Sequence, residues 1–206
     1  MKISGGNALV KSLIQHDVKH IFCVPGESYL GALDGLFEKK EKIDVFNARH
    51  EAGAANMAES YGKLTGKPGV AFVTRGPGAC HASVGIHISF QDSTPLILFV
   101  GNISRGVKDR EAFQEIDFKA FFSPISKWVA EINDPKRVPE YVNRAFNIAT
   151  EGRPGPVVLI IPEDMLTEIA EIEPRPFSRI FKNKFPEAGL KRIREELNLA
   201  KKPLLI

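Results

Sequence analysis

The 206 residues are enough for one large domain, or for one domain with an appendage. Apolar residues make up 43% of the chain, and the small formal charge of +3 is spread along it, so no basic stripe indicates a nucleic-acid partner. No apolar run reaches the ~20 residues that a membrane span needs. The first residues lack the apolar core of a signal peptide, and two cysteines are too few for a disulfide scaffold. We therefore expect a cytoplasmic protein that binds neither nucleic acid nor a membrane.

Short apolar runs alternate with helical patterns from the first residues to Pro162. Strands are predicted at 20–24, 43–46, 69–74, 95–100, 127–132 and 155–161. Helices are predicted at 4–16, 30–37, 52–64, 79–90, 118–122 and 135–150. The run at 95–100 is apolar throughout, which is typical of a parallel strand covered on both faces. This alternation predicts an α/β fold, doubly wound, with a mostly parallel six-stranded sheet and helices on both faces.

The composition changes after Pro162. Residues 172–186 are rich in proline and charge and predict an extended segment over the surface, and 188–201 form an amphipathic helical pattern. The last residues, 202–206, are similar to the beginning of a buried strand. We interpret 1–170 as one domain and 171–206 as a linker, a helix and the truncated start of a further domain. The alternative for 202–206 is a short strand at a sheet edge.

Glu51 lies where the predicted strand 43–46 passes into the predicted helix 52–64. The carboxyl ends of the strands are where open α/β sheets bind ligands. Two interpretations of this acid remain open at this point. It either stabilises the positive end of the helix dipole or points at a ligand.

Gly76-Pro77-Gly78 forms a glycine-rich turn between a strand and a helix. A dinucleotide fingerprint needs a third glycine where this chain has His81, and no phosphate-binding P-loop is present. Glycines still allow a flat ligand to approach exposed backbone N–H groups at the helix start. The histidines predict no metal site, because His81 and His87 are six positions apart and lie on different helix faces. His50 is predicted to pack or to cap the helix.

Seven motifs occur in an order and at a spacing typical of one superfamily. They are Arg49–Ala54, Tyr61-Gly62, Thr65-Gly66, Gly76–Ala79, Asp92–Pro95, Ala112–Glu115 and Gly152–Pro156. The set resembles the N-terminal, pyrimidine-binding domain of thiamine diphosphate-dependent enzymes, and within them the large subunit of acetolactate synthase and its relatives. The resemblance covers residues 1 to about 170, and the tail is similar to the link into that family's central domain.

The resemblance implies roles for residues at the sheet edge. Glu51 would hydrogen-bond a ring nitrogen of the cofactor's aminopyrimidine, so that the cofactor can lose the proton of its thiazolium carbon and attack a 2-keto acid substrate. Gly76, Pro77 and Gly78 would form the turn beside the pyrimidine. Phe113 and Gln114 would line the substrate pocket with Gly26, and Gln114 would take part in catalysis beside Glu51.

The resemblance also implies further cofactors and partners. Arg153 matches a position that contacts FAD in the acetolactate synthases, although this arginine is equally explained as a turn residue before the last strand. Mg²⁺ would be bound with the diphosphate by another domain, in continuing chain or in a partner subunit, because this chain has no Gly-Asp-Gly motif followed by asparagine. A homodimer or tetramer would complete the site.

The sequence departs from the family pattern in two places. Glu27-Ser28-Tyr29 replaces the usual glycine and small residue in a loop that borders the substrate, which leaves the acceptor and the reaction open. Cys80-His81 replaces threonine-asparagine after the pyrimidine turn, so different local contacts are expected there. An acetolactate synthase-like carboligase is the leading hypothesis, and a 2-keto acid decarboxylase or lyase is the second. A non-catalytic domain that binds a partner is an alternative of another class. A flavodoxin-like nucleotide-binding protein is disfavoured by the absence of a phosphate loop.

Overall fold

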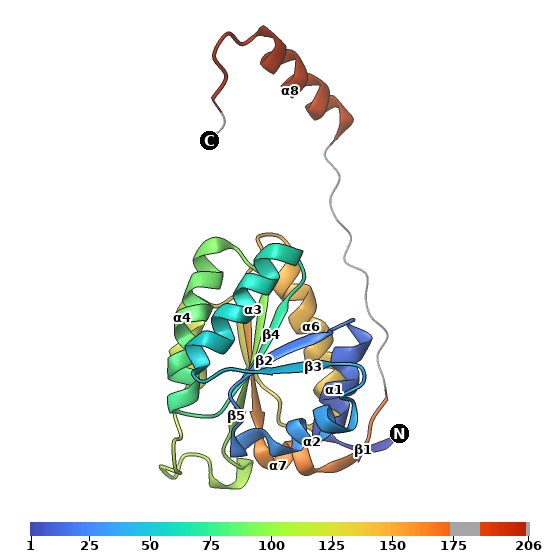
Figure 1. The fold of residues 1–206 in the computed structure, drawn as a ribbon, viewed down its shortest axis with the longest axis vertical. Coiled ribbons are helices and arrows are strands. Elements are labelled where there is room, and N and C mark those ends of the chain that lie inside the picture. Colours follow the sequence, from blue (N-terminus) through green and yellow to red (C-terminus); the bar gives the residue numbers. More distant parts are fainter. Residues whose placement is uncertain (174–185, 205–206) are drawn as a thin grey trace.

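The computed structural model describes residues 1–173 and 186–204 (Figure 1). Its main sheet has six parallel strands in the order β3-β2-β4-β5-β7-β6. The strands are β2 (His20–Cys23), β3 (Asp44–Asn47), β4 (Gly69–Val73), β5 (Leu96–Asn102), β6 (Trp128–Glu131) and β7 (Pro156–Pro162). The predicted doubly wound α/β fold and its six strands are confirmed.

Seven of the described helices cover the two faces of this sheet: α1 (Gly5–Gln15), α2 (Leu30–Glu38), α3 (Glu51–Thr65), α4 (Pro77–Asp92), α5 (Phe118–Phe122), α6 (Val138–Thr150) and α7 (Glu163–Thr167). A further helix, α8 (Glu187–Leu199), contributes no residue to either core. Helices α1, α2, α6 and α7 share one apolar core with the sheet, and α3, α4 and α5 share the other. Among the described residues, no helix is both long enough and apolar enough to cross a membrane.

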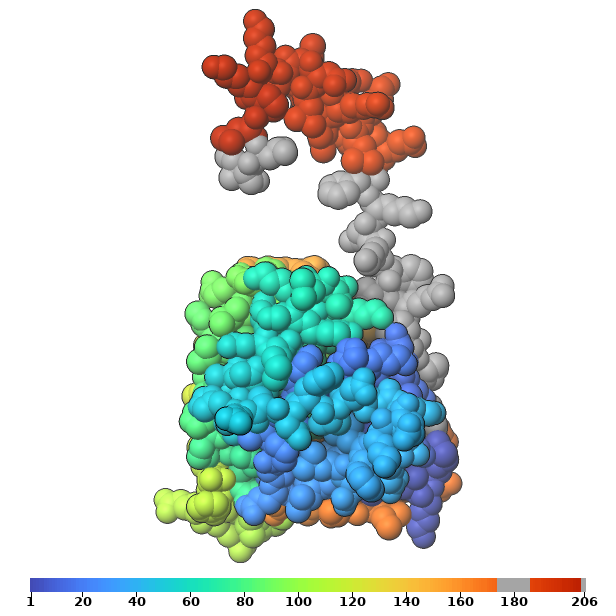
Figure 2. All heavy atoms as spheres, in the orientation of Figure 1, coloured from blue at the N-terminus to red at the C-terminus, as the bar shows by residue number. Residues whose placement is uncertain are grey.

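The degree of burial of each strand follows from its sequence. Every residue of β4, β5 and β7 is buried, as their continuous apolar runs predict for central parallel strands. All four residues of β3 are exposed, and this strand lies at one edge of the sheet. The packing between α3 and α4 is close because Gly85 allows it, since a Cβ there would lie 2.6 Å from the Cβ of Ala55. Figure 2 shows α3 and α4 side by side on the viewed face.

Three short elements were missed by the sequence analysis. The short strands β1 (Lys2–Ser4) and β8 (Ile169–Glu171) pair antiparallel in a sheet of their own, and α7 follows β7 directly. Each has three to five residues, too few for a periodic pattern to indicate a strand or helix.

The tail fits the prediction only in part. Helix α8 confirms the predicted amphipathic helix, and all its residues are exposed. Lys202–Leu204, predicted to begin a strand, are exposed and outside any strand. The predicted extended segment falls mostly on residues 174–185, and the end of the predicted strand on 205–206, both outside the described residues.

Candidate active site at the carboxyl edge of the sheet

The sheet has a topological switch point between β2 and β4. From β2 the chain passes through α2, on one face of the sheet, to the edge strand β3, whereas from β4 it passes through α4, on the other face, towards β5. Connections that leave in opposite directions open a crevice at the carboxyl ends of the strands, where such folds bind ligands. Glu51, the Gly76–Gly78 turn, Gly26 and the Phe113-Gln114 pair all follow the carboxyl ends of strands, so the fold brings these predicted site residues to one edge.

Glu51 is the first residue of α3 and is largely shielded from solvent, with a side chain only 13% exposed. One carboxylate oxygen, Oε2, lies 2.9 Å from Nδ1 of His81 on α4. His50 caps α3, because its Nδ1 accepts a hydrogen bond from the backbone N–H of Ala52, which confirms the predicted cap. The His50 and His81 rings stack with centroids 4.4 Å apart. Glu51 is therefore held by one histidine and flanked by another.

The glycine turn places backbone directly beside this carboxylate. Gly76 has φ of 57° and ψ of −113°, a conformation that disfavours any side chain, and it precedes Pro77 at the first position of α4. At Gly78 an added Cβ would lie 3.3 Å from Oε1 of Glu51 and 2.8 Å from Cγ2 of Thr74. Glycine at 78 thus allows the backbone of α4 to lie against Thr74 and Glu51.

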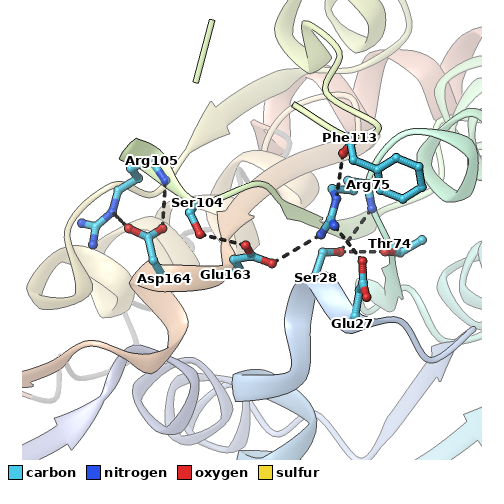
Figure 3. A network of polar contacts seen from close by, with 9 residues as sticks. All are labelled: Glu27, Ser28, Thr74, Arg75, Ser104, Arg105, Phe113, Glu163 and Asp164. Atoms are coloured by element: carbon cyan, nitrogen blue, oxygen red, sulfur yellow. Dashed lines mark hydrogen bonds and ion pairs between the residues drawn. The ribbon is translucent and has the colours of Figure 1, made fainter. Parts of the chain in front are cut away.

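Arg75 is a buried cation that ties four loops together, a role that the sequence analysis missed. It is only 7% exposed. Its Nη2 donates to Oε1 of Glu27 at 2.7 Å, its Nη1 to Oε2 of Glu163 at 3.4 Å, and its Nε to the carbonyl of Phe113 at 3.2 Å (Figure 3). These partners follow β2, β7 and β5, so one guanidinium fixes the loops around the crevice.

Hydroxyl groups strengthen this junction. Ser28 Oγ lies 2.7 Å from Thr74 Oγ1 and accepts a hydrogen bond from the backbone N–H of Arg75 (Figure 3). Tyr29 is fully buried, its hydroxyl donates to the carbonyl of Val24, and burial raises the pKa of that hydroxyl. The Glu27-Ser28-Tyr29 segment, which departs from the family pattern, is thus built into the wall of the crevice.

Phe113 and Gln114 lie on the long loop after β5. The Phe113 ring is 72% exposed, while its carbonyl is held by Arg75. Gln114 has a positive φ of 63°, and a Cβ at Gly76 would lie 2.7 Å from the Cβ of Gln114. The loop therefore packs against the glycine turn and presents an aromatic side chain to solvent.

Arg153 lies apart from the other predicted site residues. It precedes β7, at the amino end of the strands and so at the opposite edge of the sheet. Its Nε donates to Oγ of Ser93 at 2.6 Å, and its Nη2 donates to the carbonyls of Gln91 and Phe90. Arg153 therefore donates hydrogen bonds to carbonyl groups at the C-terminal end of α4, where the helix dipole favours a positive charge.

A parallel, doubly wound sheet with an acid and a glycine turn at its switch point defines a ligand-binding α/β domain. Residues 3–121 match the family described as "Thiamine pyrophosphate enzyme, N-terminal TPP binding domain". That match covers more than half of the chain, and the chain belongs to this family.

Curated relatives carry the name acetolactate synthase. The chain is 34% identical to the mitochondrial catalytic subunit of Aspergillus candidus, over 98% of this chain and 31% of that protein. It is 37% identical to acetolactate synthase of Bacillus subtilis, over 82% of this chain and 29% of that protein. It is 40% identical to the large subunit of Pyropia yezoensis, over 79% of this chain and 28% of that protein. The chain thus spans about a third of the length of these relatives.

The residues at the switch point fit the pyrimidine end of thiamine diphosphate. A largely buried carboxylate is present, and its Oε1 lies beside the backbone of Gly78, which carries no side chain. A flat ring can approach such backbone closely, and a ring nitrogen needs such a carboxylate as its hydrogen-bond partner.

Proposed function

We propose that this chain is the pyrimidine-binding part of an acetolactate synthase-like enzyme, which decarboxylates a 2-keto acid and transfers the resulting two-carbon unit. The observation that carries the proposal is the position of Glu51, whose Oε1 lies beside the Gly78 backbone at the switch point of the sheet. Similarity to acetolactate synthases along most of the chain supports the choice of reaction.

Thiamine diphosphate, when bound, supplies an electron sink for decarboxylation. In this chain Glu51 would hold a proton for, or share one with, a ring nitrogen of the aminopyrimidine. Oε1 is the oxygen that remains for this bond, because Oε2 is in contact with His81. The Gly76–Gly78 backbone would let the ring approach closely. Aspartate would be one methylene too short, and glutamine has no proton to exchange.

The substrate side of the site would be formed by the loops that Arg75 holds. Phe113 would cover the keto acid with its exposed ring, and Gln114, Gly26 and the backbone near them would border the reacting carbon. The Arg75 contact with the Phe113 carbonyl would keep this loop in place and exclude water. Gln114 is the candidate for a hydrogen bond to the substrate.

The remaining features of the enzyme belong to the same proposal. Mg²⁺ and the diphosphate would be held by a domain that contributes its own ligands, from continuing chain or a partner subunit. A homodimer or tetramer in the cytoplasm, and FAD as an additional cofactor near Arg153, complete it.

A decarboxylase or lyase of the same superfamily is the second candidate. The observation that favours it is Glu27, whose carboxylate pairs with Arg75 beside the substrate loop and is 67% exposed. An exposed negative charge there would alter which acceptor or substrate is tolerated. Product analysis separates the two, because a carboligase forms a new carbon–carbon bond and a decarboxylase releases an aldehyde.

Replacement of Glu51 by glutamine tests the proposal. In the protein that carries this chain, Glu51→Gln should lower 2-keto acid turnover with thiamine diphosphate and Mg²⁺ by about 100-fold or more, because a proton-transfer group is lost. Glu41→Gln is the matched control, since Glu41 is exposed and precedes β3 at the opposite edge of the sheet. Equal turnover by both variants would contradict the assignment of Glu51. Tight cofactor binding without turnover in the wild type would favour the non-catalytic alternative.

A further inference from the structure

We propose that His50, Glu51 and His81 form a binding site for a divalent transition-metal cation, with Zn²⁺ as the best match. The three residues each offer one ligand atom, and these atoms all lie within 4.8 Å of one another. They come from two helices that the fold places side by side, α3 and α4. The proposed site depends only on these three side chains.

The distances are close to those of a metal centre. His81 Nδ1 and Glu51 Oε2 lie 2.9 Å apart. Two ligands of one tetrahedral zinc, each about 2.0–2.1 Å from the ion, are about 3.3 Å apart. If a cation replaced the hydrogen between these two atoms, Nδ1 of His81 and Oε2 of Glu51 would need to move apart by only a few tenths of an ångström.

His50 supplies the third ligand. Its Nδ1 accepts the capping hydrogen bond from Ala52, which leaves Nε2 for a cation and fixes the tautomer in which Nε2 would otherwise carry the proton. Its ring already stacks on that of His81 with an interplanar angle of 29°. His50 is exposed and the His81 side chain is 49% exposed, so one side of the group is open to solvent. Because the two rings are stacked, both would have to rotate to direct a nitrogen at one ion.

The donor set selects the class of ion. Two imidazoles and a carboxylate are the ligands of many catalytic zinc sites, which keep a fourth position open. Mg²⁺ and Ca²⁺ prefer oxygen ligands and are disfavoured here. The N-termini of α3 and α4 oppose a cation, whereas the carboxylate of Glu51 would contact the ion directly.

A metal ion bound to Glu51 would affect the proposed binding of thiamine diphosphate. If Glu51 binds the pyrimidine ring, which rests on the proposed function, then metal and cofactor compete for one carboxylate. Zinc would thereby act as a reversible inhibitor of cofactor binding. The metal site itself is tested without reference to the cofactor.

The test is titration of the cofactor-free protein with Co²⁺ as a spectroscopic probe for Zn²⁺, in the presence of millimolar Mg²⁺ to fill oxygen sites. The wild type should give visible absorption of four- or five-coordinate Co²⁺ at one equivalent, and one equivalent of Zn²⁺ should remove it. His81→Asn and His50→Asn should each weaken binding by at least about 10-fold. His87→Asn is the matched control, because His87 is also exposed on α4, six positions further along.

The outcomes distinguish a three-residue metal site from nonspecific metal binding by single exposed histidines. Loss of the signal in the His81 and His50 variants, with retention in the His87 variant and unchanged melting temperatures, is the expected result. Equal affinities in all three variants, or no binding of Co²⁺ and Zn²⁺ by the wild type below 1 mM, would overturn the proposal. If the metal binds but does not compete with thiamine diphosphate, the metal site stands and the proposed role of Glu51 in cofactor binding fails.

Discussion

Replacement of Arg75 by methionine tests whether one buried cation holds the loops around the crevice. Methionine keeps much of the apolar stem and removes three hydrogen bonds, to Glu27, Glu163 and the Phe113 carbonyl. The two carboxylates are 67% and 40% exposed, so water replaces the lost partner and each ion pair contributes at most about 1 kcal/mol. The charge-assisted bond to the carbonyl contributes about 1.5–3 kcal/mol.

Arg75→Met should therefore lower the free energy of unfolding by about 2–3 kcal/mol, and the melting temperature by about 5–10 °C. Urea denaturation measures the first quantity and calorimetry the second. Hydrogen exchange should speed up in the loop at 103–117, because the Phe113 carbonyl loses its donor. Arg75→Lys is the matched variant, which keeps the charge but loses the planar fork, and it should have a smaller effect.

An Arg75→Met variant that is not destabilised would contradict this role of the arginine. Burial of a guanidinium costs free energy, and replacement of a buried ion pair by an apolar side chain is sometimes stabilising. If Arg75→Met is as stable as the wild type and the exchange of the 103–117 loop is unchanged, then the network in Figure 3 does not hold the crevice together.

Three further predictions concern single side chains. Burial lowers the pKa of His16 from 6.5 to about 4, so the folded protein favours the neutral imidazole. The free energy of unfolding should therefore fall by up to about 3 kcal/mol as the pH decreases from 6.5 to 4. In urea denaturation at a series of pH values, His16→Gln should show a smaller change over this range. Gly78→Ala should weaken thiamine diphosphate binding about 10-fold or more, because its methyl group would lie 2.8 Å from Cγ2 of Thr74 and 3.3 Å from Oε1 of Glu51. Gly106→Ala, where a Cβ meets nothing within 4 Å, should leave the affinity measured by calorimetry unchanged. Arg153→Ala should lower the free energy of unfolding by about 1 kcal/mol through lost contacts at the end of α4, and unchanged flavin content in the purified variant would contradict the FAD assignment.

The fold and the acid at its switch point follow from local sequence patterns. The apolar runs at β4, β5 and β7 predict buried parallel strands, and the position of Glu51 after β3 predicts that it lies at the ligand-binding edge. These features depend on residues that are near one another in the chain, so they can be predicted from the sequence alone.

Contacts between distant residues were not predicted. The His81 contact with Glu51 joins positions 30 apart, and the Arg75 pair with Glu163 joins positions 88 apart. Each depends on the strand order and on the direction of side chains at a loop, which spacing along the chain does not determine. The departure at Cys80-His81 was the one signal that pointed to altered contacts beside the turn, and His81 indeed touches Glu51.

The proposed control of the cofactor's proton by Glu51 can be measured as hydrogen–deuterium exchange at the thiazolium carbon of bound thiamine diphosphate. Quenched-flow NMR on the protein that carries this chain gives the rate without any substrate. Glu51→Gln should slow this exchange by about 100-fold or more relative to the wild type and to Glu41→Gln. Equal exchange rates in the three proteins, with the cofactor bound in each, would contradict it.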